Sequence, residues 1–151
     1  MPVIVVGADT ERGRAIVGGL ISPGREVRAF VSEPGAASEL RRAGVKVATG
    51  DVSDESHVQG AASGCFTAVL VTEAARDERE RAFASDEVDV LRGWARAAEA
   101  AGVSRVIWVT ELTELPTHGG EIARVSPSHP DLVLQVVDLD NALRLAPPER
   151  G

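Results

Sequence analysis

The first twenty residues change from an unbroken run of β-branched residues to apolar residues at helical spacing. This change constrains the fold more than any other feature. Val3 to Val6 are four consecutive β-branched residues, a run typical of a short strand buried on both faces of a parallel sheet. A turn with Gly7 and Gly13 at its ends follows, and apolar residues then recur at helical spacing from Ile16 to Ile21. The chain is therefore predicted to begin with a strand, a tight turn and a helix that packs back onto the sheet.

This order is typical of a nucleotide-binding unit, in which three turn glycines have separate roles. The first permits the turn, the second lets the backbone approach the pyrophosphate, and the third lets helix and strand pack closely. Gly7 and Gly13 suit the first and third roles, but Thr10 stands where the middle glycine is expected.

The residues around Thr10 leave two interpretations of the turn open. Asp9 and Glu11 add negative charge at the helix N-terminus, where a phosphate would bind, and only Arg12 favours an anion. The turn is either a modified dinucleotide site, or a turn in which Asp9 or Thr10 caps the helix and the ligand has been lost.

The length, net charge and cysteine content of the chain limit the class of protein. The chain has 151 residues, which we interpret as one domain spanning 1–151. A net charge of −7 argues against direct nucleic-acid binding, and the single cysteine, Cys65, suits a reducing cytoplasm. No apolar run is long enough for a membrane span, so we expect a cytoplasmic protein that does not associate with membranes.

Strand and helix patterns alternate along the rest of the chain. This alternation predicts an α/β fold with a doubly wound, mostly parallel sheet of about six strands. Residues 111–131 are predicted as a long loop and 146–151 as a tail. Further strands are expected at 26–31, 45–49, 67–72, 103–110 and 132–137, with helices at 36–43, 53–63 and 83–98.

Five stretches in register carry a family resemblance. They are residues 3–17, 24–31, 43–47, 50–54 and 97–107. Together they resemble the NmrA-like group of atypical short-chain dehydrogenases/reductases, which are NAD(P)-binding Rossmann proteins. The resemblance implies a single Rossmann-like domain with strand order 3-2-1-4-5-6 and a cofactor site whose phosphate turn includes Gly7, Thr10, Arg12 and Gly13.

The resemblance also assigns residues near the end of the second strand. Ser32 occupies the position where many relatives have an arginine for the 2′-phosphate of NADP, and Glu33 could accept a hydrogen bond from a ribose hydroxyl. NAD is therefore favoured over NADP, and a chain that binds neither is the remaining alternative.

Three further positions are assigned by resemblance, each with a structural alternative. Asp51 matches the position that faces adenine, but it also suits a turn before the next helix. Thr72 and Thr110 end two strands and would face the nicotinamide, but their hydroxyls also suit bonds to backbone groups.

The catalytic residues of the wider superfamily do not carry over. The chain has no tyrosine to act as the acid, and its only lysine, Lys46, lies in the third strand. Thr110 matches the catalytic serine position, but a hydroxyl alone does not supply a proton at neutral pH. His57, His118 and His129 lack the spacing of metal ligands, and we expect those in the long loop to be solvated or to cap turns.

These observations favour a non-catalytic NAD(P)-binding module of the NmrA-like type that acts as a sensor or regulatory partner. One alternative is an NAD(P)-dependent oxidoreductase that takes its proton from water, substrate or another subunit. Another is an interaction module that no longer binds nucleotide. A homodimer through the helix from Phe83 to Ala98, with Leu91 and Trp94 in the contact, is a further prediction.

Overall fold

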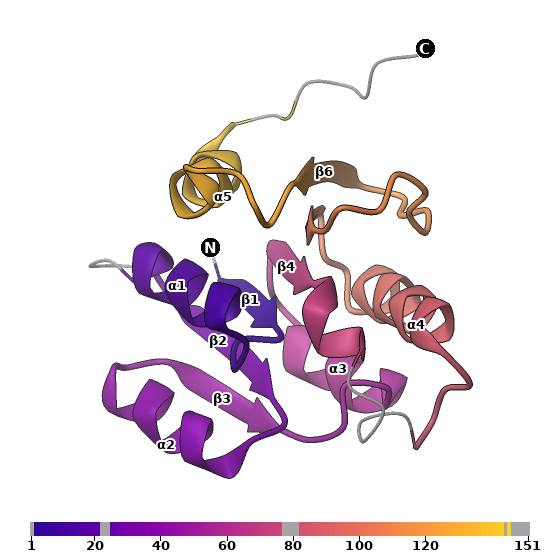
Figure 1. The fold of residues 1–151 in the computed structure, drawn as a ribbon, viewed down its shortest axis with the longest axis horizontal. Coiled ribbons are helices and arrows are strands. Elements are labelled where there is room, and N and C mark those ends of the chain that lie inside the picture. The colour runs from indigo at the N-terminus through magenta and orange to yellow at the C-terminus, as the bar shows by residue number, and fades with distance from the viewer. Residues whose placement is uncertain (1, 22–24, 77–81, 144, 146–151) are drawn as a thin grey trace.

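Within residues 2–21, 25–76, 82–143 and 145, which the computed structural model describes, the chain forms one sheet of six parallel strands (Figure 1). The strand order β3-β2-β1-β4-β5-β6 confirms the predicted doubly wound topology. The strands are β1 (Val3–Val6), β2 (Val27–Val31), β3 (Lys46–Thr49), β4 (Thr67–Val71), β5 (Arg105–Val109) and β6 (Glu121–Val125).

The first strand lies at the centre of the sheet, as its β-branched sequence predicts. Every side chain of β1 is at most 1% exposed, and Val6 is paired with Phe30 of β2 and Leu70 of β4. Because the strands are parallel, their carboxyl ends meet at one edge of the sheet, which is where ligands bind in open α/β folds. The glycine turn after β1 lies in the middle of that edge.

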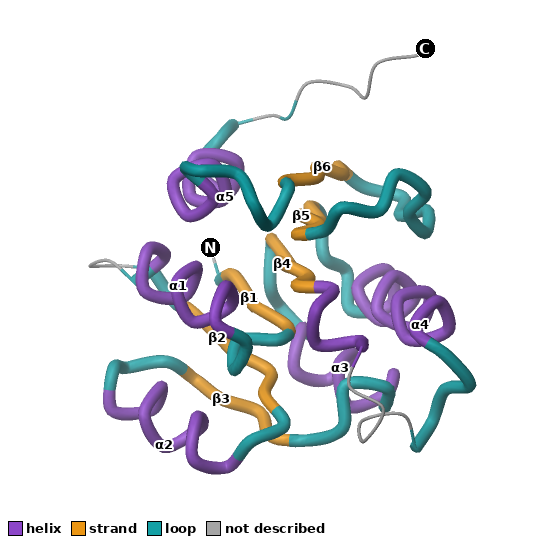
Figure 2. The backbone as a smooth tube through the Cα atoms, viewed as in Figure 1, coloured by secondary structure: helices purple, strands orange, loops and turns teal. Residues whose placement is uncertain are grey.

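Helices cover both faces of the sheet, as Figure 2 shows. On one face α1, α2 and α5 bury side chains against the strands, and on the other α3 and α4 do so. The helices are α1 (Glu11–Leu20), α2 (Pro34–Arg42), α3 (Glu55–Ala62), α4 (Glu87–Ala100) and α5 (Leu132–Asn141), with a short 3-10 helix, η1 (Thr72–Arg76), after β4.

The last third of the chain differs from the prediction. Residues 132–137, predicted as the sixth strand, lie in helix α5, where Leu132 and Val136 are buried one turn apart. The sixth strand is β6, within the segment 111–131 that was predicted to be a loop. A short, mostly apolar run such as this one fits a buried strand or a buried helix, and its periodicity does not separate the two.

A buried cation that the sequence did not single out joins α5 to the sheet. Arg105 is 0% exposed, and its Nη2 lies 2.8 Å from Oε1 of Glu121. Its Nη1 donates to the carbonyl oxygens of Leu139 and Ala142, at 2.5 and 2.8 Å, where α5 ends. These partners satisfy a charge that would otherwise be costly to bury. The predicted tail at 146–151 lies outside the described residues.

The helix predicted from Phe83 begins at Glu87, and Phe83 precedes it with a side chain that is 65% exposed. Leu91 and Trp94 are 3% and 1% exposed because they cover the sheet of their own chain. They are therefore unavailable for the contact assigned to them, and pairing of two copies stays a prediction. Among the described residues, no helix is long and apolar enough to cross a bilayer.

Candidate functional site

The two outer glycines of the turn have the geometry that their predicted roles require. Gly7 has a φ of +87°, and a Cβ there would lie 2.9 Å from the Cβ of Ala74. A Cβ on Gly13 would lie 2.1 Å from the carbonyl oxygen of Gly7. Only glycine fits either position, so the turn keeps the close helix–strand approach of a dinucleotide fold.

Thr10 caps helix α1, which is one of the two roles considered for it. Its Oγ1 donates to the carbonyl oxygen of Gly7 at 2.7 Å and accepts from the amide of Gly13 at 3.0 Å. The cap satisfies one of the amides that begin the helix. The amides of Glu11 and Arg12 have no hydrogen-bond acceptor among the described residues, so two donors remain for an anion.

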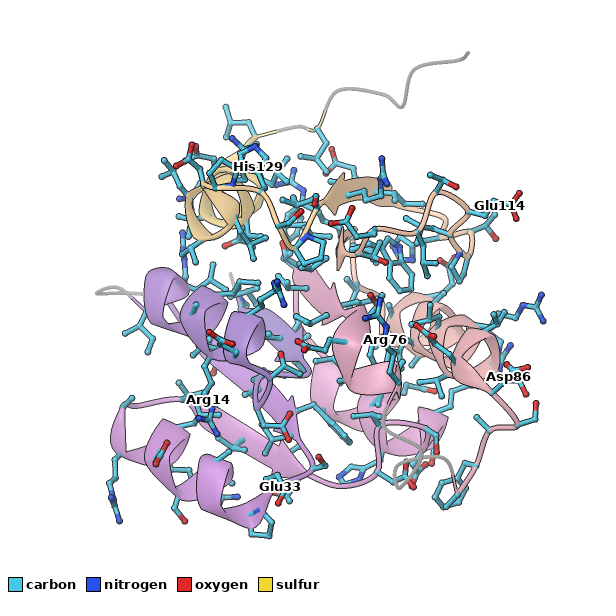
Figure 3. All side chains as sticks on the ribbon, viewed as in Figure 1. Arg14, Glu33, Arg76, Asp86, Glu114 and His129 are labelled. Atoms are coloured by element: carbon cyan, nitrogen blue, oxygen red, sulfur yellow. The ribbon has the colours of Figure 1, made fainter. Side chains whose placement is uncertain are left out.

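Asp9, the other residue considered as a cap, does not cap helix α1. Its Oδ2 accepts hydrogen bonds from the amide and hydroxyl of Ser32, at 3.0 and 2.9 Å, and from the amide of Glu33, at 3.3 Å. Glu33 lies at the start of α2 (Figure 3). The structure thus joins Ser32 and Glu33 to the turn through a contact that the sequence did not predict, and their role in binding a cofactor stays a prediction.

Asp51 holds the segment that follows it. Its Oδ1 accepts from the amide and hydroxyl of Ser53, at 2.8 and 2.7 Å, and its Oδ2 accepts from the amide of Ala82 at 3.2 Å. These bonds fit the turn role given as the alternative for Asp51. A contact between Asp51 and adenine stays a prediction.

The two threonines predicted at the nicotinamide end are buried. Thr72 is 2% exposed and donates to the carbonyl oxygen of Val109 at 3.1 Å. Thr110 is 0% exposed, and its Oγ1 accepts from the amide of Leu112 at 3.1 Å. Both hydroxyls therefore bond to backbone groups, as in the structural alternative.

A polar cluster that the sequence did not indicate lies where β5 and β6 end. Ser126 and Ser128 donate through their hydroxyls to Oε1 of Glu111, at 2.5 and 3.0 Å, and lower the pKa of that carboxyl. Glu111 is therefore held as an anion, which accepts hydrogen bonds but is a poor proton donor. Arg12 joins the same loop to α1, because its Nε donates to the carbonyl oxygen of Pro127 at 2.8 Å.

The lysine and the three histidines differ in their surroundings. His57 packs edge to face against Phe30 of β2, with the ring centroids 5.0 Å apart. Lys46 begins β3 and pairs with Glu26, so it lies at the opposite edge of the sheet, as expected. His129 accepts from the amide of Asp131 at 2.9 Å, a turn-capping role as expected. His118 differs from the expectation, because its side chain is only 1% exposed and lies beside Glu99.

Residues 7–135 match a family model described as NAD(P)H-binding. The chain belongs to this NAD(P)H-binding family. The residues present fit such a cofactor at the turn, since the glycines leave no room for a Cβ and two helix amides are open. Comparison with curated proteins gave no match.

Several solved structures share the fold of this chain. The NADP(H)-complexed triphenylmethane reductase of Citrobacter sp. is 22% identical, with a TM-score of 0.61, over 72% of this chain and 37% of the reductase. The NADPH-complexed quinone oxidoreductase QOR2 of Escherichia coli is 23% identical, with a TM-score of 0.59, over 72% of this chain and 36% of the oxidoreductase. The NAD(P)H-binding chain thus spans little more than a third of these two relatives.

A third neighbour has nearly the same extent as this NAD(P)H-binding chain. ChuY of Escherichia coli O157:H7, described as an anaerobillin reductase, is 18% identical with a TM-score of 0.64. The match covers 95% of this chain and 92% of ChuY. At this identity the likeness shows the shared fold.

Proposed function

We propose that the chain is an NAD(H)-binding module that senses the nucleotide or presents it to a regulatory partner, without a catalytic acid of its own. The observation that carries this proposal is the burial of Thr110, which by resemblance matches the catalytic serine position. Its side chain is 0% exposed and its hydroxyl bonds to the backbone. A hydroxyl that is buried and already hydrogen-bonded is poorly placed to exchange a proton with a substrate.

The choice of NAD(H) rests on the end of β2. Ser32 and Glu33 stand there in place of the arginine that binds a 2′-phosphate in many relatives. A carboxylate at this point, whether that of Glu33 or that of Asp9 beside it, accepts a ribose hydroxyl and repels a phosphate. The pyrophosphate would lie against the open amides of Glu11 and Arg12.

Calorimetry with NAD+, NADH, NADP+ and NADPH, followed by an assay for NADH oxidation, tests the proposal. We expect weak but measurable NAD(H) binding, because Thr10 has replaced the middle glycine, and no oxidation of bound NADH. Failure of all four nucleotides to bind at millimolar concentration would contradict a dinucleotide module. Catalysed oxidation would contradict the non-catalytic role.

An NAD(P)-dependent reductase is the second candidate. The similar length of ChuY and this chain favours it. The match covers 92% of that protein, which is described as a reductase, so a chain of this size is compatible with the activity. The proton would then come from water, substrate or a second subunit, since Glu111 is held as an anion. NADH consumption with a quinone and with a triphenylmethane dye, classes named for the structural neighbours, distinguishes this candidate from the first.

A further inference from the structure

We infer that Asp9 is the residue that selects between the two dinucleotides. Its carboxylate fills the position at the end of β2 where a 2′-phosphate would bind, and it accepts the ribose hydroxyl of NAD(H). This assignment rests on the proposed function. It differs from the sequence-based expectation, which gave the ribose contact to Glu33.

The contacts of Asp9 are those that a bound anion would make. One oxygen, Oδ2, accepts three hydrogen bonds, from the amide of Ser32 at 3.0 Å, its hydroxyl at 2.9 Å and the amide of Glu33 at 3.3 Å. Converging backbone amides and a hydroxyl at a helix start form a typical phosphate site. In this chain the donors are already used by a carboxylate from the neighbouring turn.

The position of Asp9 follows from the sheet. β1 and β2 are paired so that Val6 lies opposite Phe30. The turn after β1 and the start of α2 therefore lie side by side at the carboxyl edge. Asp9 reaches from one to the other, across the place where a dinucleotide ribose binds in this fold.

The second carboxylate oxygen of Asp9 provides the favourable contact with NAD(H). Oδ1 has no hydrogen-bond partner among the described residues, so it is available to a ribose hydroxyl. A 2′-phosphate would meet this fixed negative charge and find its three donors occupied. Both effects disfavour NADP(H), and like charges brought together at a binding site are strongly unfavourable.

Asp9 suits this role because it is already ordered. Three hydrogen bonds fix its half-buried side chain, whereas Glu33 is exposed. A preorganised carboxylate loses less conformational freedom when it binds.

The test is the ratio of the NADP+ and NAD+ dissociation constants, measured by calorimetry for the wild type and four variants. Asp9→Ala frees the three donors for the phosphate, and Asp9→Asn removes the charge while it keeps an acceptor oxygen. Glu33→Gln tests the competing assignment. Glu11→Gln is the matched control, because it removes a neighbouring carboxylate that has no hydrogen bond or ion pair to β2 among the described residues.

We expect the wild type to favour NAD+, and Asp9→Ala to lower the ratio by about tenfold or more, the equivalent of one well-formed charged contact. Asp9→Asn should lower it by a smaller factor, and the two glutamate variants should change it less than about twofold. Because both nucleotides are measured on each variant, a partly unfolded variant shifts both constants and leaves the ratio intact.

Two results would overturn the inference, and they differ from failure of the proposed function. NAD+ binding with an unchanged ratio in both Asp9 variants would exclude Asp9 as the selector. A larger change in Glu33→Gln than in Asp9→Ala would return the role to Glu33. Absence of binding of either nucleotide to the wild type and every variant would contradict the proposed function itself, and the inference with it.

Discussion

Thr10 closes the glycine turn with one hydroxyl that bonds to both of its ends, Gly7 and Gly13. Its side chain occupies the place where a glycine would let the backbone approach a pyrophosphate. One hydroxyl thus satisfies a carbonyl oxygen and a helix amide of the turn, and it occupies the Gly13 amide that a phosphate could otherwise use.

Replacing Thr10 should strengthen nucleotide binding at a small cost in stability. We expect Thr10→Gly to tighten NADH binding by about tenfold, because it opens the turn and frees the Gly13 amide. The free energy of unfolding should fall by about 0.5 kcal/mol, since glycine is itself a tolerable cap. Calorimetry and urea unfolding measure the two effects.

Thr117→Gly is the control for that variant, because Thr117 is an exposed loop residue distant in sequence from the turn. It should leave the NADH affinity unchanged. An unchanged affinity in Thr10→Gly as well would show that the cap does not limit binding.

Cys65 has a buried thiol whose pKa is raised by that burial. At pH 8 the folded protein therefore contains less of the reactive thiolate than the unfolded chain. We expect the native thiol to react with a disulfide reagent at least about 100-fold more slowly than the urea-unfolded thiol. Rapid stoichiometric labelling of the native protein would show that the thiol is accessible.

At the scale of elements, α1 and α5 pack closely through a glycine. A Cβ on Gly19 would lie 2.2 Å from Cγ1 of Val133, whereas a Cβ on Gly18 would have no atom within 4 Å. Two adjacent glycines of one helix therefore face different surroundings.

Substitution of the two glycines by alanine should have opposite effects on the free energy of unfolding. Gly19→Ala should lower the free energy of unfolding by about 1–3 kcal/mol, because it forces the two helices apart. Gly18→Ala should raise it by about 0.5–1 kcal/mol, because alanine is a better helix former. Urea unfolding of both variants measures this difference. Equal effects would mean that α5 does not pack on α1 as described.

Most helices and strands are predictable from local sequence. The helix α5 and the strand β6 are the exceptions. The burial of Leu132 and Val136 and the 58% exposure of Leu134 follow a helical period, but the run of apolar residues also fits a strand. β6 carries a weak signal, because this edge strand is only partly buried and includes Arg124 and Glu121. The choice between the two depended on tertiary packing.

At the scale of the whole molecule, the parallel sheet explains which site residues could be predicted. Strands aligned at one edge bring Gly7, Ser32 and Asp51 to a common surface from distant parts of the sequence. Side-chain conformations at this edge could not be predicted from the sequence. The contact of Asp9 with Ser32 and the burial of Thr110 depend on rotamers and local packing, which residue spacing does not encode.

The most direct test of the central claim is an amide chemical-shift titration of the wild-type protein with NADH. A dinucleotide at the carboxyl edge predicts the largest shifts at Gly7 to Gly13, at Ser32 and Glu33, and near Asp51. Shifts confined to other surfaces, or no shifts at millimolar NADH, would contradict the account and leave a fold that has kept the turn without its ligand.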